Sequence, residues 1–144
     1  MSHFLKLLVL GALLLSGCAA GTRFESAHPG TRLTIGDRQA TELPAALKLP
    51  SKSTGQHEFM AEASDGNRLY GILPLRVNGG KMAASIMFFA PALFLGGFRD
   101  VFPYYQFDVE DGVLRYKTEA NDEWRLYQPT TAEQERARAY FQRN

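Results

Sequence analysis

Apolar and polar residues alternate along much of the chain beyond residue 30, with the two-residue period of half-buried β-strands. Residues 31–36 form the first such run, which ends in a Gly-Asp pair typical of a turn. Residues 43–49 form the second, in which Pro44 favours an edge position or the start of a strand. The spacing predicts short strands joined by turns in this part of the chain.

Two Asp-Gly dipeptides predict β-hairpins, because this pair favours a two-residue type I′ turn. The first hairpin joins residues 57–63 to residues 69–77, and a two-residue turn at 65–66 would place Phe59 opposite Ile72 and other apolar residues opposite one another.

The second hairpin joins residues 104–110 to residues 113–118 across Asp111-Gly112. A two-residue turn would place Asp108 opposite Arg115 on one face and pair apolar residues on the other, so one register satisfies both faces. Residues 123–128 predict a third strand after this hairpin.

The end of the chain predicts a helix over residues 130–142. Thr130 and Glu133 have the spacing of a capping box. Three residues would dock this helix on the sheet: Ala137, Tyr140 and Phe141. The fold class expected is therefore mainly β, a small antiparallel β-sandwich or sheet with a C-terminal α-helix.

An uncharged segment runs from Met82 to Phe98 and contains Pro91. As a helix it would span about 25 Å, short of the roughly 30 Å hydrocarbon core of a bilayer. Insertion into a membrane is one interpretation. We favour the other, a buried strand over residues 82–89 followed by a turn or short helix, because Pro91 and the glycines after it fit such punctuation.

The first residues have the organisation of a signal peptide. Lys6 precedes an apolar run over residues 7–15 that is too short to span a bilayer. The run ends in Leu15-Ser16-Gly17-Cys18, which resembles the lipobox of bacterial lipoproteins. An ordinary secretory signal that happens to contain a cysteine is the alternative.

The resemblance implies cleavage before Cys18, a diacylglycerol joined to its sulfur as a thioether, and an N-acyl chain on its freed amino group. The residue after Cys18 is Ala19 rather than Asp, which in this family permits transport to the outer membrane of a cell with two membranes; a host with one membrane stays open. The expected organisation is a signal peptide over 1–17, a lipidated tether over 18–26 and a single β-rich domain over 27–144.

Within that domain we distinguish residues 27–80, an apolar segment over 81–103, the hairpin and strands over 104–128, and the helix. The first part resembles a PEGA domain, a small β-sandwich module of bacterial envelope proteins. The resemblance rests on His28-Pro29-Gly30-Thr31, the Gly36-Asp37 turn and Thr41-Glu42-Leu43-Pro44, and it departs at the signature, where His-Pro-Gly-Thr stands for Pro-Glu-Gly-Ala. The resemblance implies a role as a scaffold or in protein interactions, and it identifies no catalytic residues.

The composition of the chain argues against several classes of function. The net charge of +1 argues against nucleic-acid binding, which needs a basic face. One cysteine permits neither a disulfide within the chain nor a Cys-rich zinc site. Removal of residues 1–17 leaves a formally neutral chain, so attachment to a membrane would depend on lipid rather than on a basic patch.

Residues with catalytic chemistry are few. His28 and His57 are the histidines of the mature chain, and we expect His57 to be a hydrogen-bonded structural residue because it falls on the apolar face of its strand. The acidic cluster Asp108, Glu110 and Asp111 lacks the further oxygens that calcium needs, so the hairpin accounts for it.

Six aromatic residues could form a surface for glycan stacking, but the strand pattern favours a role in the core of the sheet; they are Phe102, Tyr104, Tyr105, Tyr116, Trp124 and Tyr127. Three arginines of the helix are expected on its solvated face: Arg136, Arg138 and Arg143.

These observations predict a non-enzymatic protein of the outer membrane, held by lipid at the periplasmic face, which acts as a scaffold or interaction module for an envelope protein partner. We expect no catalytic, metal or cofactor-binding residues, and one lipid attachment site, Cys18. The alternatives are a hydrolase directed at the cell wall, and a module that inserts into the membrane through the segment from Met82 to Phe98.

Overall fold

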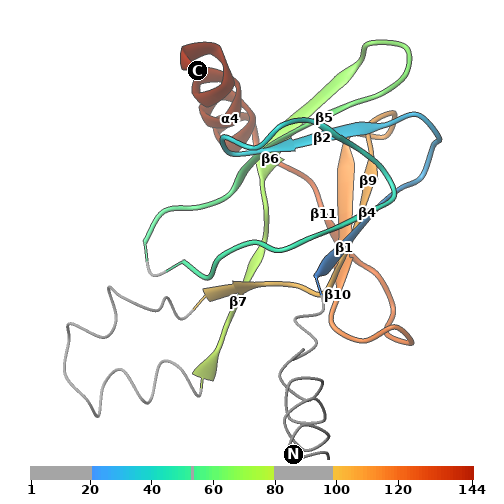
Figure 1. Ribbon diagram of the computed structural model, residues 1–144, viewed down its shortest axis with the longest axis vertical. Coiled ribbons are helices and arrows are strands. Elements are labelled where there is room, and N and C mark those ends of the chain that lie inside the picture. Colours follow the sequence, from blue (N-terminus) through green and yellow to red (C-terminus); the bar gives the residue numbers. More distant parts are fainter. Residues whose placement is uncertain (1–20, 53, 80–98) are drawn as a thin grey trace, which may run out of the picture.

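The structure is a computed structural model, and it describes residues 21–52, 54–79 and 99–144 (Figure 1). The expected signal peptide, the lipid attachment site Cys18 and the segment from Met82 to Phe98 lie outside the described residues. In chain order the elements are β1 (Thr22–Ser26), β2 (Arg32–Ile35), β3 (Thr41–Glu42), β4 (Ala45–Leu47), β5 (Glu58–Glu62), β6 (Arg68–Ile72), β7 (Leu75–Val77), β8 (Arg99–Val101), β9 (Tyr104–Asp108), β10 (Val113–Lys117), β11 (Arg125–Tyr127) and α4 (Thr131–Arg143).

The strands form three sheets, so the fold is mainly β, as the hydropathy pattern predicts. The largest sheet has the order β11-β10-β9-β1-β4, the second has the order β3-β2-β5-β6, and β7 pairs with β8 in a short ribbon. All of these pairs are antiparallel except β1 and β9, which run parallel. The parallel pairing of β1 with β9 is the one departure, among the described strands, from the antiparallel arrangement that the sequence predicts.

Strand β1 also corrects the expected tether over residues 18–26. Its five residues lie inside the largest sheet, between β9 and β4, and the side chain of Phe24 is fully buried. The Phe24 ring stacks on Tyr105 with the ring centroids 5.3 Å apart. Residues 22–26 are therefore part of the largest sheet, and Phe24 is part of the core of the domain.

The two larger sheets pack face to face and share one hydrophobic core. Phe107 of β9 meets Phe59 of β5 edge to face, with the ring centroids 5.0 Å apart, and both side chains are fully buried. The same core contains Phe24, Tyr105 and Leu114 from one sheet and Leu33, Ile35, Ala61 and Leu69 from the other. Burial of apolar area between the sheets is the main stabilising contribution.

Helix α4 forms a third layer on β5 and β6 (Figure 1). Both halves of the predicted capping box are present, because the Thr130 hydroxyl accepts from the backbone N–H of Glu133 and the Glu133 side chain accepts from the backbone N–H of Thr130. Ala137 is fully buried against the sheet, and the Phe141 ring lies 6.4 Å from the ring of Tyr70. The predicted helix and its docking residues are confirmed.

The first predicted hairpin is present, but its register differs by one residue. Ala63 donates to the carbonyl of Asn67, so the loop has three residues, and Gly66 adopts a φ of 89°. A three-residue loop with glycine in the left-handed region is a common alternative to the two-residue turn. Phe59 consequently lies opposite Gly71 rather than Ile72.

The second hairpin differs from its predicted register by two residues. Val113 pairs with Asp108, so the loop contains four residues, 109–112, rather than two. A shift of two keeps every side chain on its predicted face, and Phe107 lies opposite Leu114 in the core. The predicted contact between Asp108 and Arg115 survives as a diagonal pair with 3.3 Å between Oδ2 and Nη1.

The chain passes from the second sheet to the first between β3 and β4, through the cis Leu43-Pro44 peptide bond. β4 is an edge strand of the largest sheet, as Pro44 predicts. The third predicted strand after the second hairpin is β11, at the other edge of that sheet.

Candidate functional site

A wedge-shaped opening in the largest sheet begins where β1 begins. Thr22 of β1 pairs with Leu47 of β4, and the Arg23 N–H donates to the carbonyl of Pro103 at 2.9 Å. Farther along, Lys52 and Arg99 pair directly through two backbone hydrogen bonds of 2.9 and 3.0 Å. Where β1 lies between them, the β4 segment and the segment before β9 are therefore two strand spacings apart, and at Lys52 and Arg99 they are one spacing apart. One strand spacing is about 4.8 Å. The space between them ahead of β1 is not filled by a described strand.

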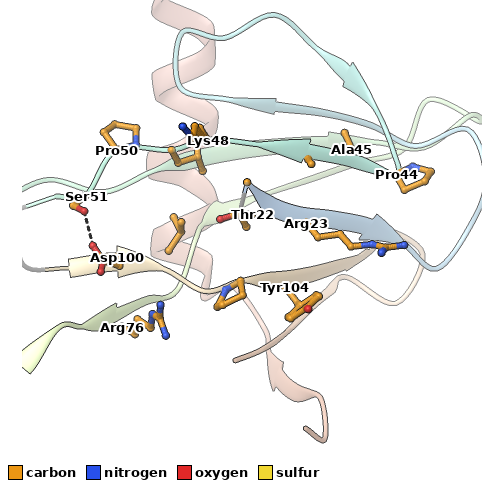
Figure 2. A pocket seen from close by; sticks show the side chains of 15 residues that line it. Thr22, Arg23, Pro44, Ala45, Lys48, Pro50, Ser51, Arg76, Asp100 and Tyr104 are labelled. Atoms are coloured by element: carbon orange, nitrogen blue, oxygen red, sulfur yellow. Dashed lines mark hydrogen bonds between the residues drawn. The ribbon is translucent and has the colours of Figure 1, made fainter. Parts of the chain in front are cut away.

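This opening is the mouth of a groove with a volume of about 1030 Å³. Figure 2 shows Thr22 at the start of β1, between the segment that carries Pro44 and Pro50 and the segment that carries Asp100 and Tyr104. The groove is lined by Gly21, Thr22, Arg23, Pro44, Ala45, Ala46, Lys48, Leu49, Pro50, Ser51, Arg76, Asp100, Val101, Pro103 and Tyr104.

Two buried side chains hold the walls of the groove through hydrogen bonds to the backbone. The imidazole Nε2 of His57 lies 3.0 Å from the carbonyl oxygen of Pro50, on one wall. The Tyr105 hydroxyl accepts from the backbone N–H of Phe102 at 2.9 Å and donates to the carbonyl of Pro74 at 2.6 Å, beneath the other wall. Both side chains are buried, so the groove is supported by the core of the domain.

Burial affects the ionisation of both supporting residues. It lowers the pKa of His57 below its ordinary value, and the hydrogen bond to Pro50 opposes this shift only in part. It raises the pKa of Tyr105, which therefore remains a neutral phenol that can donate to Pro74. The predicted hydrogen bond of His57 is confirmed, and its side chain is buried.

Some charged residues of the groove have hydrogen-bond or ion-pair partners among the described residues, and others have none. Asp100 accepts from the Ser51 hydroxyl and, at 3.1 Å, from the amide of Asn78. Arg23 forms an exposed ion pair with Glu25 at 2.7 Å. Within the described ranges, neither the Lys48 ammonium nor the Arg76 guanidinium forms a hydrogen bond or an ion pair. Three basic residues and one acidic residue therefore line the groove, and two of the cations have no charged partner in the part of the chain that the structure describes.

Serine and aspartate meet in the groove without a histidine. Ser51 and Asp100 are hydrogen-bonded there, but neither His57 nor His28 is among the lining residues. His57 uses its Nε2 atom on the Pro50 carbonyl. A serine nucleophile needs an adjacent base to remove its proton, and the described residues place no histidine in this groove to complete a Ser-His-Asp triad.

His28 lies elsewhere, beside the predicted acidic cluster. Its Nε2 atom is 3.2 Å from a carboxylate oxygen of Glu110 and 3.6 Å from one of Asp108. Burial alone would raise the pKa of Asp108, but the hydrogen bond from the N–H of Asp111 and the Arg115 guanidinium outweigh it and hold that pKa below its ordinary value. Asp108 therefore stabilises the turn of its hairpin by accepting a hydrogen bond from the backbone of Asp111.

No group of three or more His, Cys, Asp or Glu residues with the geometry to hold a metal ion occurs among the described residues. None of the helices in residues 21–52, 54–79 and 99–144 is long and apolar enough to cross a membrane.

The aromatic residues divide between core and surface. Phe102 and Tyr105 are buried, as the strand pattern predicts. Tyr104 and Trp124 are partly exposed, and the Lys117 ammonium lies 4.4 Å from the centre of the Trp124 ring. Arg136 and Arg138 are exposed on α4 but not free, since Arg136 lies 3.8 Å from Glu58 and Arg138 lies over the ring of Tyr70.

Sequence reasoning did not identify the groove. Its residues come from four separate stretches of the chain, and no short motif joins them. Arg23 was assigned to the tether, and Lys48 and Arg76 had no distinguishing pattern around them. The only local signal was the concentration of prolines at 44, 50 and 103, which limits the number of backbone donors along both walls.

Comparison with known proteins adds no identity to this geometry: no protein-family model, no curated protein and no solved structure matches the chain.

Proposed function

We propose that this protein is a lipid-anchored component of the bacterial envelope, in which the β-sandwich is a non-enzymatic binding module and the groove is its binding site. Cys18 carries a diacylglycerol and an N-acyl chain, and the domain lies at the periplasmic face of the outer membrane. There it acts as a scaffold or interaction module for an envelope partner.

The observation that carries this proposal is the position of the groove relative to Cys18. Gly21 lines the groove and is the third residue after Cys18. Three extended residues span at most about 11 Å. The polar interfacial layer of a leaflet is itself roughly 5–8 Å thick. A lipid on Cys18 would therefore hold the mouth of the groove at or just above the headgroups.

The chemistry of the groove supports binding rather than catalysis. Its walls carry apolar side chains and two cations without a charged partner among the described residues, and neither His28 nor His57 lines the groove beside its serine–aspartate pair. The supporting contacts of His57 and Tyr105 fix the shape of the walls. Such a preformed groove with a few polar groups is typical of a ligand site.

The lipid anchor is tested by labelling cells with an alkyne fatty acid and fractionating their membranes. The wild-type chain and Ser16→Ala, which keeps a small residue in the lipobox, should carry the label and sediment with membranes. Cys18→Ser should lose the label, because no other cysteine is present. Equal labelling of Cys18→Ser and wild type would contradict the proposal.

A further inference from the structure

The groove also indicates the chemistry of a ligand. We propose that it binds the phosphate-bearing headgroup of an anionic membrane lipid, with Lys48 and Arg76 pairing with the phosphate; this inference rests on the proposed anchoring of Cys18. The proposed function does not specify a ligand, whereas the charge of the groove, the composition of its walls and its position favour this one.

The charge of the groove favours an anion. Lys48 and Arg76 lie on its two walls without a side-chain partner among the described residues, and Arg23 adds a third cation near the start of β1. Asp100, the one acid of the lining, is held by Ser51 and Asn78. Lysine and arginine are the usual partners of phosphate, because both donate charged hydrogen bonds to its oxygens.

The walls favour a lipid over an extended peptide. A peptide strand added to β4 or to the segment before β9 would need backbone N–H donors, and Pro44, Pro50 and Pro103 have none. The apolar side chains of Leu49 and Val101 instead offer contact for the glycerol and the first methylene groups of a lipid. A groove with cations and an apolar wall suits an amphiphile.

The position of the groove near the lipid anchor would place it beside a high concentration of lipid headgroups. Its lining begins three residues after Cys18, so an anchored domain would keep the groove at the level of the lipid phosphates for as long as the anchor holds. The effective concentration of headgroups beside it would be high, and even a weak site would be occupied. Anionic lipid at the surface also attracts the cations before contact.

The test is a calorimetric titration of the full-length protein, purified from membranes in a neutral detergent. The ligands are dihexanoyl-phosphatidylglycerol, dihexanoyl-phosphatidylcholine and inorganic phosphate. The groove variant is Lys48→Gln with Arg76→Gln. The matched control is Arg125→Gln with Arg143→Gln, which removes the same charge from two exposed residues on β11 and α4.

We expect phosphatidylglycerol to bind at least about tenfold more tightly than phosphatidylcholine. Each cation near an anionic lipid contributes about a fivefold change in affinity, so the groove variant should bind roughly 25-fold more weakly and the control within about twofold of wild type. Equal losses in both variants would show only a general effect of charge and would overturn the inference.

Two other results would also overturn it. Inorganic phosphate binding as tightly as phosphatidylglycerol would assign the groove to free phosphate. No binding of any of the three ligands, together with capture of a protein by a photocrosslinker at Ala46, would assign the groove to a protein partner. Labelling of Cys18 is measured separately, so a labelled protein that binds no lipid refutes this inference alone, and an unlabelled protein that binds lipid refutes the anchor alone.

Discussion

The hydroxyl of Tyr105 is a single atom on which one wall of the groove depends. Tyr105 is fully buried, and its hydroxyl accepts from Phe102 and donates to Pro74. Tyr105→Phe deletes this oxygen and keeps the ring, which stacks on Phe24 at 5.3 Å. The substitution therefore removes two hydrogen bonds with little change in apolar packing.

The cost follows from the two backbone groups left behind. A buried donor or acceptor without a partner costs about 1–3 kcal/mol. The backbone N–H of Phe102 and the carbonyl of Pro74 both lose their partner, and we take roughly 2 kcal/mol as the combined loss of unfolding free energy after local relaxation. At about 4 °C per kcal/mol for a domain of this size, the melting temperature should fall by about 8 °C.

Thermal unfolding followed by circular dichroism measures this loss, and Tyr116→Phe is the matched control. The Tyr116 ring lies 4.5 Å from that of Phe102, and its hydroxyl bonds to no residue in the described ranges. The control should melt within about 2 °C of wild type, as expected for a change of less than about 0.5 kcal/mol. Tyr105→Phe melting within that same interval would refute the reasoning.

Three further substitutions test the fold. Gly71→Ala would place a Cβ 2.7 Å from the ring of Phe59, and this overpacking should cost about 1–3 kcal/mol in urea unfolding. Asp108→Asn should cost about 1–2 kcal/mol at pH 7. Because the fold lowers the pKa of this carboxyl, the difference from wild type should shrink as the pH falls below the ordinary value of 3.8 and vanish once the pH is below the lowered pKa; a difference independent of pH would refute the assignment. Thr130→Ala should cost about 1 kcal/mol by removing the helix cap, whereas Thr131→Ala should cost less than half of that, and equal losses would contradict the capping box.

The elements that sequence reasoning predicted correctly are those defined by local patterns. The capping box of Thr130 and Glu133 lies within one helical turn, and its residues bond as their spacing requires. The alternating strands are likewise local, because their period appears in the sequence without knowledge of their partners. The mainly β fold with a C-terminal helix follows from these two signals.

The registers of the two hairpins were wrong because the loops are longer than an Asp-Gly pair suggests. In each loop the glycine adopts a positive φ, but the turn includes one or two additional residues. Loop length depends on which residues the core buries: Leu69 is 5% exposed and replaces Tyr70 opposite Ala61. The turn preference of an Asp-Gly pair does not include the free energy gained by burying Leu69 in the core.

Strand β1 and the groove lay beyond sequence reasoning for the same reason. Thr22–Ser26 pairs in parallel with β9, about eighty residues away, and no local feature of five mixed residues indicates this partner. Among the described residues, the groove opens where β1 begins, between two neighbouring segments that extend farther. Its three basic residues line one groove only in the folded sheet, which brings four separate segments of the chain together.

The central claim is that the anchored domain holds its groove at the membrane surface. The chain has one cysteine, so after lipidation an Ala46→Cys or a Gln142→Cys variant offers a single free thiol for a fluorophore. Ala46 lines the groove, whereas Gln142 is exposed on α4, which lies above and to the left of β1 in Figure 1. In vesicles that carry a quencher on the lipid headgroup, the account predicts strong quenching at position 46 and weak quenching at position 142. Equal quenching at the two positions, or stronger quenching on α4, would contradict it.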